Sequence, residues 1–188
     1  MKRRSIALGL PLLALCSASA VRAGDWLPAP MLPEVLLRDQ RDQPVRLREL
    51  IRGRLVVVNF VFGSCVTVCP PQTALLREAA RQIAAHPVLR DVLFVSLTVD
   101  PLSDGPLQLR QYAARFDLPV GPPVRWVLLT GSIDNVQKTL APFAATTSSP
   151  ADHPALLWLG HESRGRWTRT SALNPPHMLI RRLEALIS

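Results

Sequence analysis

The amino-acid sequence predicts an α/β fold in which a central mixed β-sheet is flanked by helices. The first observation behind this prediction is that apolar, β-branched runs alternate with segments whose apolar residues recur at helical spacing. The second is the order of the expected elements: strand, helix, strand, helix, strand, and then a hairpin and a closing helix. The chain has 188 residues, which suits one compact domain and a targeting segment.

The first half of the expected fold contains a hairpin, a buried strand and a helix. Residues 34–50 are predicted to form a short strand or the entry to a hairpin, with a turn at residues 39–42. Residues 55–60 are a continuous apolar run, which is typical of a strand buried on both faces. Residues 70–84 are predicted to be helical, because their apolar residues recur at helical spacing and two prolines suit the first turn.

The alternation of buried strands and helices then continues. We expect a strand at residues 92–99, a helix at residues 106–116 and a third strand at residues 124–129. A short helix at residues 132–140 follows, with a polar residue available as its N-cap.

The last part of the chain is expected to complete the sheet. Residues 141–152 form a loop rich in Ala, Thr and Ser. Residues 155–159 and 167–170 are predicted to be two strands joined by a turn around Gly165. Residues 175–187 then form an amphipathic helix.

Residues 1–23 are predicted to be a signal peptide or an N-terminal anchor. Residues 2–4 are basic, residues 6–14 are apolar, and small residues follow, so that cleavage is expected after Ala20 or Ala23. The apolar stretch is shorter than the roughly 20 residues that a membrane-spanning helix needs.

The remaining chain divides into a linker and one domain. Residues 24–33 are rich in Pro and Ala and are expected to be a linker, which leaves residues 34–188 as the folded domain. The N-terminal signal predicts export. We therefore expect a periplasmic protein that is either soluble or tethered to the inner membrane by an uncleaved N-terminal segment.

The basic composition does not indicate nucleic-acid binding. The formal net charge is +8, but its arginines are spread thinly along the chain. No basic run with interleaved aromatic residues is present, which is the pattern that follows a phosphate backbone. We therefore expect no nucleic-acid partner.

Cys65 and Cys69 are the only cysteines of the expected mature chain, and they lie where a buried strand ends and a helix begins. Free backbone N–H groups and the positive end of a helix dipole stabilise a thiolate at such a junction. Because residues four apart share one face of a helical turn, the two sulfurs could meet one metal ion or each other. The pattern favours a metal site or a redox pair over two merely buried cysteines.

Asp100 follows the second buried strand, so it is expected at the same sheet edge as the cysteines. Two interpretations stay open for it: a carboxylate that orients the site, or a turn-forming residue before Pro101. The same two interpretations apply to Asp104, for which the turn is favoured.

His153 ends the polar loop and lies just before an expected strand, so the loop could carry its imidazole over the cysteine turn. The alternative is an ordinary exposed loop histidine. His86, His161 and His177 are better explained as surface residues. Two thiolates and one imidazole form a soft donor set, which favours copper over zinc, because zinc usually needs four ligands or an open catalytic water.

Three motifs together resemble those of the Sco/SenC family of copper-handling proteins. They are residues 58–70, which contain both cysteines, residues 97–101 with Asp104, and residues 152–154, which place Asp-His-Pro before a strand. The likeness extends from about residue 32 to the C-terminus. Val66 stands where many members of the family have a proline.

The resemblance implies a thioredoxin-like fold with Cys65, Cys69 and His153 as ligands of copper, Cu(I) or Cu(II), and with Asp100 as a neighbour. It also implies a metallochaperone that delivers copper to the dinuclear copper site of cytochrome c oxidase, or reduces the cysteines of that site. The implied partners are the oxidase subunit that carries the site and other periplasmic copper or thiol-redox proteins.

A general periplasmic thiol–disulfide oxidoreductase is the alternative function, because it would need only Cys65 and Cys69. The usual redox motif has two residues between its cysteines, whereas this chain has three. A peroxidase-type relative fits less well, since the pocket of Pro, Thr and Arg that such enzymes need is not seen before Cys65.

Overall fold

The computed structural model describes residues 26–120 and 125–188. The signal peptide or anchor predicted at residues 1–23 therefore lies outside the described residues.

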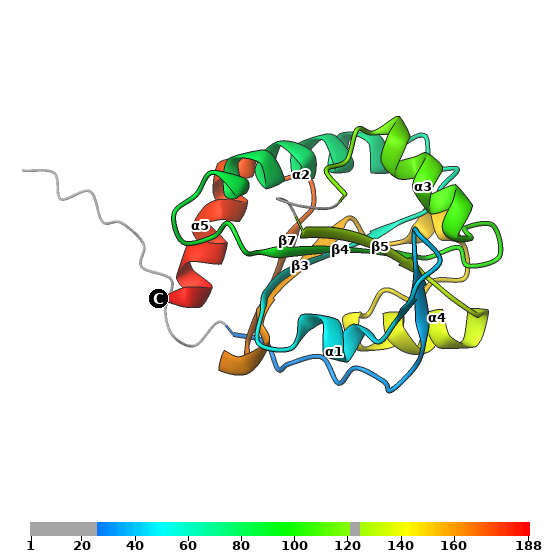
Figure 1. Cartoon of the computed structure of the whole chain (residues 1–188), viewed down its shortest axis with the longest axis horizontal. Coiled ribbons are helices and arrows are strands. Elements are labelled where there is room, and N and C mark those ends of the chain that lie inside the picture. The colour runs from blue at the N-terminus through cyan, green and yellow to red at the C-terminus, as the bar shows by residue number, and fades with distance from the viewer. Residues whose placement is uncertain (1–25, 121–124) are drawn as a thin grey trace, which may run out of the picture.

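A seven-stranded mixed sheet forms the centre of the domain, with the strand order β2-β1-β5-β4-β3-β6-β7 (Figure 1). The strands β3, β4 and β5 are parallel, while β1 and β2 on one side and β6 and β7 on the other pair antiparallel with their neighbours. The predicted mixed sheet is therefore confirmed. Its strands are β1 (Leu37–Asp39), β2 (Pro44–Val45), β3 (Leu55–Val61), β4 (Leu93–Thr98), β5 (Arg125–Thr130), β6 (Leu156–His161) and β7 (Arg166–Ser171).

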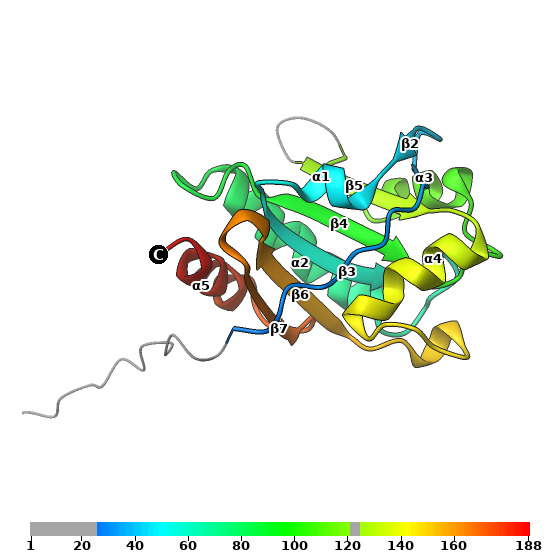
Figure 2. The same cartoon turned by 90° about the horizontal axis from the view of Figure 1, so that it is seen from below.

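Helices cover both faces of this sheet. On one face lie α2, α3 and α5, and on the other lie α1 and α4 (Figures 1 and 2). A hydrophobic core fills the space on each side, so every residue of β3 is buried. The helices are α1 (Leu47–Ile51), α2 (Cys69–Ala84), α3 (Pro106–Arg115), α4 (Ile133–Leu140) and α5 (Pro176–Ile187).

The strand directions bring three separate segments to one edge of the sheet. Val61 and Thr98 pair at the carboxyl ends of the parallel strands β3 and β4, so the loops that follow them are neighbours. Because β6 runs antiparallel to β3, its first residues lie at the same edge, where Val58 pairs with Trp158. The residues just before β6 therefore meet the loop after β3.

The predicted hairpin is confirmed, and one short helix was not expected. The hairpin consists of β1 and β2, in which Leu37 pairs with Val45. The additional helix is α1, whose Leu47 and Ile51 are buried against the sheet. A helix this short contains too little sequence for a helical period to stand out.

The loop expected at residues 141–152 contains two short 3₁₀ turns, η1 (Ala141–Phe143) and η2 (Pro150–Asp152). The ring of Phe143 lies 5.9 Å from that of Phe60 and 5.6 Å from that of Trp158, centroid to centroid. The indole N–H of Trp158 also donates to the Phe143 carbonyl at 3.0 Å. The start of the segment that leads to His153 is therefore packed into the core.

Residues 26–33 are the described part of the expected linker, and their first residues contact the outer strand of the sheet. The Leu27 N–H donates to the carbonyl of Trp167 in β7 at 2.7 Å, which forms an isolated antiparallel bridge. Within residues 26–120 and 125–188, no helix is both long enough and apolar enough to cross a membrane.

Candidate metal centre

A tight turn between β3 and α2 carries the two cysteines. The N–H of Cys65 donates to the carbonyl of Phe62 at 3.2 Å, which closes the turn. Cys69 is the first residue of α2, and its N–H donates to the Sγ of Cys65 at 3.3 Å. Free amides at a helix start stabilise negative charge, so this contact favours a thiolate on Cys65.

Gly63 is held through both polar atoms of its backbone. Its N–H lies 3.0 Å and 2.9 Å from the two carboxylate oxygens of Asp104. Its carbonyl accepts from the guanidinium of Arg115 at 2.8 Å. A Cβ at this position would lie 2.5 Å from Asp104 Oδ1, so only glycine fits against the carboxylate. The turn is thus fixed to the loop after β4 and to the end of α3.

Asp104, rather than Asp100, is the carboxylate that contacts the cysteine turn. Asp104 is buried, and the hydroxyl of Thr98 also donates to it at 2.7 Å. Asp100 lies in the turn after β4, where its carboxylate accepts from the N–H of Ser103 at 3.4 Å and its own N–H donates to Thr98. These contacts match the turn-forming interpretation of Asp100.

His153 reaches the cysteines from the segment before β6. Its side chain is buried, and its Nε2 lies 3.7 Å from the Sγ of Cys69. The Phe62 ring meets the imidazole edge-on, with centroids 5.6 Å apart. Its Nδ1 lies 3.4 Å from the carbonyl of Pro154, and because a carbonyl only accepts, this contact places the proton on Nδ1. The lone pair of Nε2 then faces the sulfurs.

Cys65, Cys69 and His153 together form one cluster of ligand atoms. The two sulfurs and the imidazole nitrogen all lie within 4.8 Å of one another, and all three residues are buried. The side chains come from positions up to 88 residues apart, from Cys65 to His153, which the edge of the sheet brings together. Of the histidines, only His153 belongs to this cluster among the described residues.

The surroundings give the three groups different acidities. Burial raises the pKa of Cys65, but hydrogen bonds from the side chain and N–H of Cys69 and from Thr67 outweigh it and bring that pKa below its ordinary value. Burial and the hydrogen bond to Cys65 raise the pKa of Cys69 to about 12. Burial lowers the pKa of His153, so its imidazole is neutral at pH 7. Cys65 is therefore the more acidic thiol.

The donor set suits a soft metal ion. Thiolate sulfur and neutral imidazole nitrogen are the ligands that copper and zinc take from proteins. Three donors within 4.8 Å of one another leave the low coordination number that Cu(I) accepts. A bound ion would also release the proton of Cys69, because the thiolate is the ligand.

The comparisons with known proteins agree with this fold. The family model described as SCO1/SenC matches residues 29–188. The chain belongs to the SCO1/SenC family. Its sequence is 31% identical over 128 residues to a SCO1 protein homolog of Bacillus subtilis, an alignment that covers 68% of this chain and 63% of that protein. The chain thus spans less than two thirds of the length of that relative.

Solved Sco structures share the fold. A SCO1/SenC family lipoprotein from Bacillus anthracis superposes with a TM-score of 0.71 and 26% identity, covering 90% of this chain and all of that one. Copper-bound yeast Sco1 superposes with a TM-score of 0.69 and 18% identity, covering 86% of this chain and 88% of that one. The predicted thioredoxin-like Sco fold is confirmed.

Two residues that support the cysteine turn, Gly63 and Arg115, were not predicted from the sequence. No sequence pattern identifies Arg115, because it lies at the end of a helix 52 residues from its partner Gly63. For Gly63, the only sign in the sequence was that a glycine precedes the cysteines. The glycine leaves room for the Asp104 carboxylate to pack against the turn. Val66 lies between the two cysteines and is 82% exposed, so it does not pack in the core.

Proposed function

We propose that this chain is a copper-binding assembly protein that serves the dinuclear copper site of cytochrome c oxidase. The observation that carries the proposal is the buried cluster of Cys65, Cys69 and His153, with all ligand atoms within 4.8 Å. Structures of yeast and Arabidopsis thaliana relatives are described as copper-bound. A further relative, BsSco, is described as a member of the Sco family of cytochrome c oxidase assembly proteins.

Each residue of the cluster has a role in holding copper. Cys65 supplies the first thiolate, since its pKa is lowered. Cys69 supplies the second once the ion displaces its proton. The imidazole of His153 offers Nε2, because Nδ1 faces the Pro154 carbonyl. Copper is the cargo of such a protein, so the site must bind it and also release it.

Reduction of the client cysteines is the second route by which the same site could serve the oxidase. The lowered pKa of Cys65 supports it, because the thiolate is the attacking species. Cys65 would attack a client disulfide and Cys69 would resolve the mixed disulfide. The client gains two thiols, and this chain ends with a Cys65–Cys69 disulfide, which an external thiol reductant must reduce again.

The proposed place of action is the periplasm, either in solution or tethered to the inner membrane. The N-terminal signal predicted at residues 1–23 supports this location. The proposed partners are the oxidase subunit with the dinuclear copper site and the periplasmic copper or thiol-redox proteins that would supply metal or electrons.

Two transfers with a purified client fragment, reduced in one and oxidised in the other, test the proposal and separate its two routes. In the first, the Cu(I)-loaded chain is mixed with the reduced client, and copper on each partner is measured. In the second, the metal-free reduced chain is mixed with the oxidised client, and free thiols are counted. We expect His153→Ala to impair copper retention and transfer while leaving disulfide reduction intact, since only the cysteines take part in it.

His161→Ala is the matched control, because His161 lies outside the cluster. A parent protein that binds no Cu(I) would contradict the copper proposal. Reduction of many unrelated disulfides as fast as that of the client would instead favour a general oxidoreductase.

A further inference from the structure

A groove between β7 and α5 lies apart from the metal centre. Its walls include Trp26, Thr168, Met178, Arg181 and Arg182, and it encloses about 480 Å³. We call it the α5 groove. It follows the outer edge of the sheet, because β7 is the last strand in the sheet order.

The α5 groove is cationic. Arg181 and Arg182 line it. A third arginine, Arg166, lies beside the groove, with its guanidinium 5.9 Å from the ring centroid of the lining residue Trp26. No carboxylate is among its lining residues, and none of these three arginines forms an ion pair with a residue in the described part of the chain. The positive charge of the groove is therefore not neutralised by described acidic residues.

The groove also offers apolar surface beside its charges. Trp26 is half-buried, and Met178 is 39% exposed. A tryptophan beside arginines is the combination found at the level of lipid headgroups, where the ring lies at the interface and the guanidinium groups face phosphates. The groove thus has the chemistry of a membrane-surface contact.

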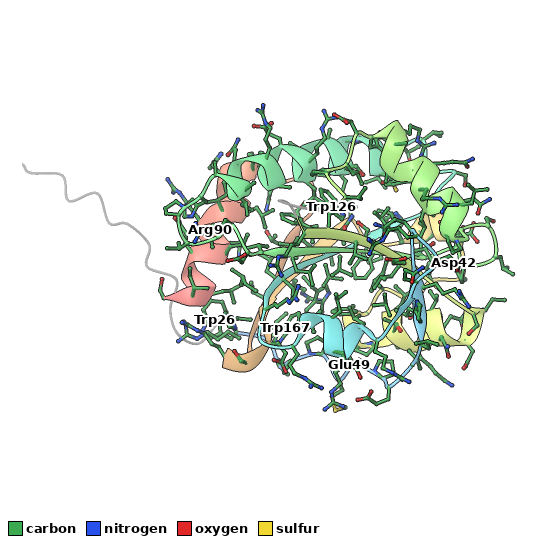
Figure 3. All side chains as sticks on the ribbon, viewed as in Figure 1. Trp26, Asp42, Glu49, Arg90, Trp126 and Trp167 are labelled. Carbon is green, nitrogen blue, oxygen red and sulfur yellow. The ribbon has the colours of Figure 1, made fainter. Side chains whose placement is uncertain are left out.

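The position of the groove places it where the chain would approach a membrane. Trp26 is the first described residue, and 25 residues precede it, including the apolar stretch at residues 6–14. Trp26 and α5 lie at the opposite end of the sheet from the carboxyl ends of β3 and β4 (Figures 2 and 3). A bilayer that contacts the groove would therefore leave the Cys65–Cys69–His153 centre open to a partner.

We propose that the α5 groove is a docking surface for an anionic lipid bilayer. Trp26 and Met178 enter the interface, and Arg166, Arg181 and Arg182 contact headgroup phosphates. The surface orients the domain so that the metal centre faces away from the membrane. This proposal does not depend on which metal the centre holds.

Vesicle partitioning of the full chain, purified as its host produces it, tests the proposal. Partitioning is measured on phosphatidylcholine vesicles with and without phosphatidylglycerol, at low and high salt. Residues 2–4 are basic and would also favour the anionic vesicles, so the contribution of the groove is the difference between the parent and a variant that lacks its arginines. We expect a clear preference for the anionic vesicles that salt weakens.

The variant R181Q/R182Q should reduce that preference about 30-fold, since each arginine near an anionic surface contributes about one kcal/mol. The matched control is R46Q/R48Q, which removes the same charge from exposed arginines at α1, on the other face of the sheet. The control should keep the preference of the parent. Equal partitioning of the parent on both vesicles, or an unchanged preference in R181Q/R182Q, would overturn the proposal.

Two further measurements identify what occupies the groove. Brominated lipids should quench part of the tryptophan fluorescence of the parent and not of Trp26→Phe, because the other three tryptophans are buried. Absence of such quenching would contradict insertion of Trp26. An oligoglutamate peptide that binds the parent but not R181Q/R182Q, with no vesicle preference in either, would assign the groove to an acidic protein partner instead.

Discussion

Gly63 links the cysteine turn to two charged residues from other parts of the chain. Its N–H faces the Asp104 carboxylate and its carbonyl faces the Arg115 guanidinium. Arg115 is itself held in place, with its guanidinium 4.7 Å from the ring centroid of Phe116 and 5.4 Å from that of Tyr112. The position of Cys65, two residues later, therefore depends on contacts that span the domain.

Gly63→Ala should destabilise the fold and disturb the metal centre. The new Cβ would lie 2.5 Å from Asp104 Oδ1, so the buried carboxylate or the turn must move and its hydrogen bonds weaken. We expect a loss of about 1–3 kcal/mol in the free energy of unfolding, measured with urea. Gly105→Ala is the control, since its Cβ would meet only the end of the Gln108 side chain, and it should cost less. Equal losses in both variants would contradict this role of Gly63.

Asp104→Asn should remove a pH dependence of stability. Burial raises the pKa of Asp104 above its value in the unfolded chain, more than the hydrogen bonds from Thr98 and Gly63 lower it. The folded state then binds the proton more tightly, so this contribution to stability is present at low pH and is lost as pH rises through the raised pKa. The parent should therefore lose stability relative to Asp104→Asn as the pH rises above about 4, the ordinary pKa of an aspartate, and through the raised pKa of the folded state. A constant difference in unfolding free energy across this range would contradict the prediction.

At the scale of the element, β3 and β4 were predicted to within a residue or two because their burial is complete. Continuous apolar runs mark strands covered on both faces, and every residue of both strands is buried. The N-cap of α4 also follows from local chemistry, since the Ser132 hydroxyl accepts from the N–H of Asn135 at 3.3 Å. α1 could not be predicted, because five residues with two buried contacts show no period.

The hairpin of β6 and β7 depends on Gly160, and no pattern in the sequence indicates that a glycine is needed there. Gly160 pairs with Trp167 across the two strands, and a Cβ on Gly160 would lie 2.2 Å from the nearest atom of that indole. Trp167 is 1% exposed and packs in the core beneath α1 and α4, so it cannot move aside freely. The indole fills the place that a side chain at position 160 would need.

Gly160→Ala should therefore lower the free energy of unfolding by about 1–3 kcal/mol, as overpacking of a core does. The measurement is chemical denaturation, with Trp167→Leu and the double variant completing a cycle. If the clash is with the indole, the double variant should lose less than the two single losses combined. Strictly additive losses would show that the two residues do not compete for the same space.

At the scale of the whole molecule, the metal centre joins two segments that are distant in the sequence. The turn from β3 into the start of α2 supplies Cys65 and Cys69, and the segment before β6 supplies His153. The cysteines could be predicted from the sequence because their spacing is local. His153 could be proposed because it precedes a strand, but its 3.7 Å approach to Cys69 depends on β6 pairing with β3. The contacts of Gly63 with Asp104 and Arg115 join residues far apart in the sequence, so no local sequence pattern predicts them.

Binding of Cu(I) should stabilise the whole domain, because only the folded chain brings the three ligands together. At a free ligand concentration of 100 times Kd the gain is about 2.7 kcal/mol. Thermal unfolding of the reduced protein with and without Cu(I) measures it. The gain should shrink in His153→Ala and persist in His161→Ala. An equal gain in both variants would mean that the ion binds without His153.

The most direct test of the copper centre is the optical and EPR spectrum of the Cu(II) complex, recorded for the parent and for Cys65→Ser, Cys69→Ser and His153→Ala. The parent should show thiolate-to-copper charge transfer, because both sulfurs and Nε2 of His153 converge within 4.8 Å. Each cysteine variant should lose or strongly weaken this band, and His153→Ala should change both the band and the copper hyperfine pattern. A parent spectrum without charge transfer, or one that all three substitutions leave unchanged, would contradict a copper centre built from these residues.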